Sequence, residues 1–170
     1  QGTTSVVAVH STSVTGMMES SLRGAGHRIL AGVTGAFSKR FGQVAESLGK
    51  EVHLLEVAWG MGVQPEDLAA ALENDGPFDA VALVSNETST GVRTPLGPIG
   101  EVLARHEDTH LLVDVVSYVA GMPVDFDKNR IDFAFAGVQK ALALPPGIAV
   151  FCVSERYLER ARGVSDRGFY

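Results

Sequence analysis

Two charged residues, Asp114 and Lys140, stand in apolar surroundings and could do chemistry together. Asp114 ends the apolar run LLVD, and Lys140 follows a second apolar run, residues 131–136, among small and apolar neighbours. Runs of this kind, bounded by Gly or Pro, predict buried parallel strands. Ligands of open α/β sheets collect beyond the carboxyl ends of such strands. We therefore expect both side chains at one edge of a sheet.

The chemistry that such a pair favours is catalysis with a pyridine cofactor. A lysine among apolar groups has its ammonium form disfavoured, so it can present a free amine that forms a Schiff base at neutral pH. A carboxylate at a neighbouring strand end can hold a protonated ring nitrogen and so make a pyridine an electron sink. Taken singly, either residue would also fit an ordinary surface residue or helix cap.

A hydroxyl-rich turn near the start of the chain is a candidate phosphate site. Residues 5–9 predict a strand, residues 10–16 a turn and residues 17–23 a helix. The free N–H groups and the dipole of a helix N-terminus both favour an anion at such a turn. Ordinary N-capping by Ser or Thr is the alternative, and the residues alone favour it.

Two further positions follow predicted strands. Thr88 lies in the polar run NETSTG after residues 80–85, which could form a ligand edge or a simple Ser/Thr turn. Phe37 stands where a strand at residues 28–33 meets a helix. Phe37 and Phe41 are four residues apart, so both could instead be core residues on one helix face. For Phe41 we expect the core position.

The order of elements predicts the fold class. Five or more strand–helix alternations indicate an α/β protein, a three-layer α/β/α sandwich with a mostly parallel sheet. The remaining expected elements are strands at 51–57 and 148–153 and helices that begin at Pro65, span 98–105 and follow Ser154. A length of 170 residues suits one domain with a sizeable core.

Composition argues against several classes of protein. The net charge of −6 leaves no basic stripe for nucleic acid. No apolar run is long enough to span a bilayer, and the first residues lack the charged region of a signal peptide, so we expect a cytoplasmic protein. The five histidines lack metal-ligand spacing, so we expect no metal. We expect Cys152 and Trp59 to pack, and Arg93 to be a solvated loop residue.

Four motifs together resemble a known family. LLVDVVS, GVQKALALPPG, NETSTGV and GAFSKRFGQVAESLG are similar to the class V (fold-type I) aminotransferases that use pyridoxal 5′-phosphate, particularly the alanine/serine–glyoxylate and phosphoserine aminotransferase-like branch. The Asp-to-Lys spacing, 140 − 114 = 26 residues, is also similar. The resemblance covers nearly the whole chain. It implies that residues 1–170 are the cofactor-binding large domain, without the N-terminal arm and the small C-terminal domain.

The resemblance also implies roles for individual residues. Lys140 would form the Schiff base and carry a proton between the substrate and the cofactor, Asp114 would keep the ring nitrogen protonated, and Phe37 would stack on the ring. The other implied cofactor contacts are Ser13, Val14, Thr15 and Gln139 at the phosphate, Thr88 at the phenolic oxygen and Val116 against the ring. Residues 13–15 depart from the glycine-rich GSGTG form common in the family.

The function implied is transfer of an amino group from a small amino acid, of the alanine, serine or phosphoserine type, to a 2-oxo acid. The full-length protein would be a homodimer whose missing parts supply the arginine for the substrate carboxylate. One alternative is a lyase or cysteine desulfurase, but those relatives place a His before the lysine, where this chain has Gln139, and use a loop Cys. A truncated, non-catalytic α/β module is the other alternative.

Overall fold

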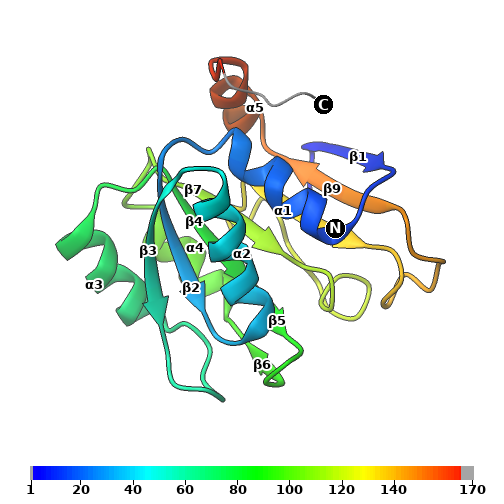
Figure 1. The fold of residues 1–170 in the computed structure, drawn as a ribbon, viewed down its shortest axis with the longest axis horizontal. Coiled ribbons are helices and arrows are strands. Elements are labelled where there is room, and N and C mark those ends of the chain that lie inside the picture. The colour runs from blue at the N-terminus through cyan, green and yellow to red at the C-terminus, as the bar shows by residue number, and fades with distance from the viewer. Residues whose placement is uncertain (1, 166–170) are drawn as a thin grey trace.

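In a computed structural model, residues 2–165 are described, and they form a seven-stranded sheet with helices on both faces (Figure 1). The strands are β1 (Val6–His10), β2 (Arg28–Val33), β3 (Glu51–Glu56), β4 (Ala80–Val84), β7 (His110–Asp114), β8 (Phe133–Gly137) and β9 (Ala149–Val153). Their order across the sheet is β1-β9-β8-β7-β4-β2-β3. Neighbouring strands from β8 to β3 run parallel, and β9 is antiparallel to both β8 and β1.

The helices divide between the two faces of the sheet. On one face lie α1 (Val14–Arg23), α2 (Ala36–Ser47) and α5 (Glu155–Arg162), and on the other lie α3 (Pro65–Asp75) and α4 (Leu96–Leu103). Side chains alternate along each strand, so each face has its own core. Phe135 packs with Met17 and Phe41 on the first face, and Val113 packs with Leu68 and Ile99 on the second. The predicted three-layer α/β/α sandwich is confirmed.

Capping residues explain where the helices begin. The hydroxyl of Ser13 accepts a hydrogen bond from the N–H of Gly16 at 3.1 Å, so α1 begins at Val14, three residues before the predicted start. Ser154 caps α5 in the same way through the N–H of Tyr157, and Pro65 occupies the first turn of α3, both as predicted.

A small antiparallel hairpin follows β4 and was not predicted. It consists of β5 (Asn86–Glu87) and β6 (Val92–Arg93), which pair Asn86 with Arg93 and Glu87 with Val92 (Figure 1). Gly91, with φ of 70°, makes the left-handed turn between them. Arg93 is exposed as expected but lies on β6 and not in a loop. The hairpin projects from the carboxyl edge of the sheet.

Three packing predictions had different outcomes. Phe41 is 1% exposed in the core, which confirms its assignment. Trp59 is 76% exposed on the loop after β3, so the prediction that it packs is wrong. Cys152 is half-buried against the core of β8 and β9. In the described part of the chain, no helix is long and apolar enough to cross a membrane.

Candidate active site

Asp114 is a buried carboxylate at the middle of the sheet. It ends β7, between β4 and β8, and is 4% exposed. Its Oδ1 accepts a hydrogen bond from the N–H of Val116 at 2.8 Å. Burial raises the pKa of Asp114 to about 7, the bond from Val116 opposes the rise, and the negative charge of Glu87 adds to it. A cation placed beside Asp114 would therefore stabilise the ionised carboxylate.

One cavity of about 170 Å³ gathers the predicted site residues. They come from five separate segments of the chain, and those that line the cavity are Val14, Thr15, Phe37, Thr88, Asp114, Val116, Gln139 and Lys140. The cavity lies at the carboxyl edge of the parallel strands, where the sequence predicted it. Ser13 does not line the cavity, and its hydroxyl is used as the N-cap of α1, so the N-capping alternative holds for this residue.

One end of the cavity can receive an anion. Val14 and Thr15 form the first turn of α1, where backbone N–H groups have no acceptor within the helix. Gly137 lets the side chain of Gln139 lie close to this turn. A Cβ on Gly137 would collide with Oε1 of Gln139 and would lie 2.7 Å from Cγ2 of Val14. The side-chain amide of Gln139 thus lies near the free N–H groups at the N-terminus of α1.

Apolar side chains form the walls of the cavity. Phe37 lies in the first turn of α2 and is 43% exposed, whereas Val116 is 8% exposed. An exposed aromatic ring beside a buried carboxylate offers a surface on which a flat ring can stack. Phe37 and Phe41 share one helix, yet the first lines the cavity and the second lies in the core.

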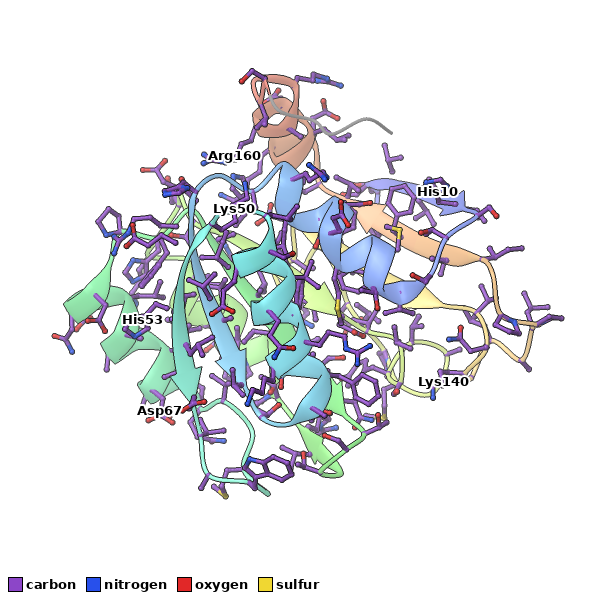
Figure 2. The ribbon with its side chains drawn as sticks, in the orientation of Figure 1. His10, Lys50, His53, Asp67, Lys140 and Arg160 are labelled. Carbon is purple, nitrogen blue, oxygen red and sulfur yellow. The ribbon has the colours of Figure 1, made fainter. Side chains whose placement is uncertain are left out.

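Lys140 lines the cavity but is exposed. It lies on the loop between the antiparallel strands β8 and β9, and residues 139–148 are exposed except for the half-buried Leu142. The expected apolar surroundings of this lysine are therefore wrong for the described chain. Figure 2 shows Lys140 at the edge of the molecule that lies opposite Arg160. The position still allows its amine to reach a ligand in the cavity.

Sequence reasoning missed five lining residues, Met18, Arg40, Val84, Asn86 and Ser117. Arg40 lies three residues after Phe37 on the same helix, and Asn86 lies two residues before Thr88, so helical and strand periodicity could have found both. Met18 and Val84 are buried and read as core residues. Nothing in their sequence pattern separates them from the rest of the core.

Cys152 does not line this cavity, and no cluster of metal-ligating side chains was found in the part of the chain that the structure describes. Within residues 2–165, no three or more His, Cys, Asp or Glu side chains lie close enough together to hold a metal ion. Cys152 lines a different, apolar cavity of about 200 Å³ together with Val7 and Val150. Burial raises the pKa of its thiol. These facts argue against Cys152 as a nucleophile in the cavity of Asp114.

The aminotransferase class-V family model matches residues 1–169. The chain belongs to the class-V aminotransferase family. It is 38% identical over 161 residues to the serine–glyoxylate aminotransferase of Methylorubrum extorquens, across 91% of this chain and 40% of the relative. It is also 38% identical over 142 residues to the (S)-ureidoglycine–glyoxylate transaminase of Bacillus subtilis, across 82% of this chain and 34% of the relative.

Solved structures of the family share the fold. The alanine–glyoxylate aminotransferase from Nostoc sp. superposes with a TM-score of 0.90 at 33% identity, over 97% of this chain and 45% of that chain. A cysteine desulfurase from Thermococcus onnurineus, with a TM-score of 0.74 at 18% identity, shares the fold alone. This class-V chain thus spans about 40% of the length of curated relatives such as the Methylorubrum enzyme.

Proposed function

We propose that this chain is the cofactor-binding domain of a pyridoxal 5′-phosphate-dependent aminotransferase. The reaction moves an amino group from a small amino acid, of the alanine, serine or phosphoserine type, to a 2-oxo acid. The observation that carries the proposal is the single cavity that joins Asp114, Lys140, Phe37 and the N-terminus of α1. Membership of the family and relatives named for glyoxylate transamination support it.

The residues present fit pyridoxal phosphate. A buried carboxylate whose pKa is raised to about 7 matches a protonated pyridine nitrogen, because the cation offsets the cost of burying the charge. The N-terminal turn of α1 and the amide of Gln139 match a phosphate. Phe37 and Val116 offer apolar surfaces for the ring between these ends.

Each side chain then has a defined task. Pyridoxal phosphate, when bound, supplies an aldehyde and an electron-withdrawing ring. Asp114 would hold the protonated ring nitrogen, and the hydroxyl of Thr88 would hold the phenolic oxygen. The Nζ of Lys140 would hold the cofactor covalently at its aldehyde, with release of water, and would serve as the base that carries the proton of the substrate α-carbon.

The proposal extends to the whole protein, a cytoplasmic homodimer in which further segments complete the substrate site. Exposure of Lys140 and of the loop around it is consistent with a site that is covered by more protein than this chain. The competing function is a non-catalytic α/β module. It predicts that replacing Lys140 changes no activity, whereas the aminotransferase requires the lysine.

The test is covalent labelling of the lysine. The purified chain is mixed with pyridoxal phosphate, its visible absorption is recorded, the adduct is fixed with borohydride, and the labelled peptide is mapped. We expect a label on Lys140 and its loss in Lys140→Ala. Lys128→Ala is the matched control, because Lys128 is also exposed but does not line the cavity.

Labelling spread evenly over exposed lysines, with no preference for Lys140, would contradict the proposal. A second measurement addresses the reaction class. Adding L-alanine or L-serine to the labelled but unreduced chain should convert the absorption band and release pyruvate or hydroxypyruvate, while Lys140→Ala releases neither.

A further inference from the structure

The carboxylate of Glu87 is buried beside the cavity but does not line it. Glu87, in β5, is 0% exposed. Its Oε2 accepts hydrogen bonds from the N–H of Phe37 (3.1 Å) and from the N–H (2.8 Å) and hydroxyl (2.9 Å) of Ser38. Its Oε1 accepts from the N–H (3.2 Å) and hydroxyl (2.6 Å) of Ser89. Desolvation opposes the charge of Glu87, but these bonds outweigh it and lower the pKa.

These bonds clamp the start of α2 to the β5–β6 hairpin. Gly35, the N-cap of α2, has no side chain to cap the helix, and the first turn carries no acidic residue. Glu87 supplies the missing acceptor from another segment, and Ser89 Oγ accepts from the N–H of Ala36 at 2.9 Å. A Cβ on Gly35 would lie 2.6 Å from Cγ of Glu87, so glycine permits this close approach.

The clamp connects two walls of the cavity. Phe37 donates one of the clamped N–H groups, and Thr88 lies between Glu87 and Ser89 in the hairpin. Phe37 and Thr88 both line the cavity. The position of the Phe37 ring relative to Thr88 and Asp114 therefore depends on Glu87.

The charge of Glu87 also acts on Asp114. The other charged groups that line the cavity are Arg40 from α2 and Lys140 from the loop after β8, and both are exposed to solvent. The lining residues from α1 and β4 carry no charge. Glu87 is thus a second buried carboxylate beside this cavity, and its negative charge, like that of Asp114, favours a cation there.

We propose that Glu87 is a positioning residue for the cofactor ring. By clamping α2 to the hairpin it fixes the ring of Phe37 in the cavity wall, and by its negative charge it makes the Asp114 end selective for a cationic ring. This inference rests on the proposed function. It adds a residue that acts through Phe37 and Asp114 without touching the cofactor.

The first measurement needs no cofactor. The carboxyl of Asp114 is titrated by carbon-detected NMR in the cofactor-free chain and in Glu87→Gln. We expect the pKa of Asp114 to fall when the charge is removed, because the negative charge of Glu87 raises it. Amide hydrogen exchange at residues 36–38 should accelerate, because the glutamine amide cannot accept all the bonds that the carboxylate accepts.

Asp79→Asn is the matched control. Asp79 also accepts two backbone N–H groups, from His27 at 2.7 Å and from Arg28 at 2.8 Å, and pairs with Arg160 at the opposite edge of the molecule (Figure 2). Its replacement should lower stability without changing the pKa of Asp114 or exchange at residues 36–38. A purely structural role for Glu87 predicts that both variants leave the titration of Asp114 unchanged.

Ser89→Ala tests the hydrogen bonds of the clamp separately from the negative charge of Glu87. It also serves as the test variant if Glu87→Gln does not fold. It removes a donor to Glu87 and an acceptor for Ala36 while the carboxylate stays. We expect faster exchange at residues 36–38 and a pKa of Asp114 that stays near 7. Unchanged exchange in this variant would overturn the clamp.

The second measurement is the affinity for pyridoxal phosphate. We expect Glu87→Gln to weaken binding roughly tenfold or more, as loss of charge-assisted hydrogen bonds does, and Asp79→Asn to leave it unchanged. The inference would be overturned if Glu87→Gln left the pKa of Asp114 unchanged and reduced the affinity no more than Asp79→Asn does. Absence of any binding by the unmodified chain would count against the proposed function, while the titration and exchange would still decide the role of Glu87.

Discussion

The carboxyl of Asp114 is destabilising wherever it is ionised without a cation beside it. Its pKa in the folded chain, about 7, exceeds the ordinary value of 3.8, so folding favours the protonated form. The stability that it contributes is fully present below pH 4 and is lost as the pH rises to 7. By pH 8, the free energy of unfolding that is lost in this way amounts to roughly 4 kcal/mol.

Asp114→Asn should therefore stabilise the cofactor-free chain at pH 8 by up to about 4 kcal/mol and have little effect at pH 4. Urea unfolding at both pH values measures this difference. The same variant should bind pyridoxal phosphate more weakly, because the amide cannot match the charge of the ring nitrogen. A stability change of the same size at both pH values would contradict the assignment.

The two phenylalanines of α2 should respond to replacement in opposite ways. Phe37→Ala removes a half-exposed ring from the cavity wall, so it should weaken cofactor binding about tenfold with little loss of stability. Phe41→Ala removes a ring that is 1% exposed and should lower the free energy of unfolding by about 3–5 kcal/mol. Cofactor titration and urea unfolding of both variants distinguish the roles, and equal effects would contradict them.

Residue types at strand ends located most of the cavity. Asp114 and Thr88 follow apolar runs, and Phe37 stands at a strand–helix junction. The predicted strands and the positions of these residues at the strand ends were therefore sufficient to group them in one cavity. Exposure was not predictable at Lys140 or Trp59, because the sequence around each does not show what covers a loop. Glu87 was missed because its partners, Phe37 and Ser38, lie about 50 residues away in the chain.

At the scale of elements, Asp132 joins two strands to α5. It is 2% exposed, and its carboxylate accepts bonds from Nε (2.7 Å) and Nη2 (2.6 Å) of Arg156, the hydroxyl of Ser154 (2.7 Å) and the N–H of Leu111 (2.9 Å). Desolvation would raise the pKa of Asp132, but the neighbouring imidazole of His110 and the hydrogen bonds from Arg156 and Ser154 lower it well below the ordinary range. Its contribution to stability is present above pH 4 and is lost as the pH falls.

Arg156→Ala should lower the free energy of unfolding at pH 7 by about 3 kcal/mol, because it leaves a buried carboxylate without its cation. The loss should shrink in acid, where Asp132 takes up a proton. Arg162→Ala is the control, since the pair of Arg162 with Glu155 is mostly exposed and should contribute below about 1 kcal/mol. Thermal unfolding of both variants at pH 7 and pH 4 provides the measurement, and equal losses would contradict the role of Asp132.

The sequence predicted elements with strong periodicity or caps and missed those without. Strands β4, β7 and β8 are buried along their length, and β2 is buried after Arg28, so each contains an apolar run. Strands β5 and β6 contain two residues each, too few for a pattern of alternation to mark them. The reversed direction of β9 depends on its pairing with β8 and β1, which composition does not encode.

At the scale of the molecule, the sheet is covered unevenly. Helices α3 and α4 pack against the core on one face, but near β9 and β1 an apolar cavity of about 200 Å³ opens on that side. Val7 lines it and is 60% exposed. Exposed apolar surface of this kind binds hydrophobic dyes.

Val7→Ser should reduce the fluorescence of bound anilinonaphthalene sulfonate. Val6→Ser is the control, because Val6 is 51% exposed but points to the other face of the same strand, away from this cavity. Dye titration of the folded chain checks the difference. Equal reductions in both variants would place the dye elsewhere.

The exposed loop that carries Lys140 makes the chain susceptible to proteolysis at the lysine itself. Trypsin should cut between Lys140 and Ala141, because exposed loops are preferred sites of nicking. Strands β8 and β9 flank the cut and are hydrogen-bonded neighbours, so residues 1–140 and 141–170 should stay associated until denatured. A lysine whose amine is covalently occupied is no longer a trypsin site, so resistance to digestion would report directly on occupancy of Lys140.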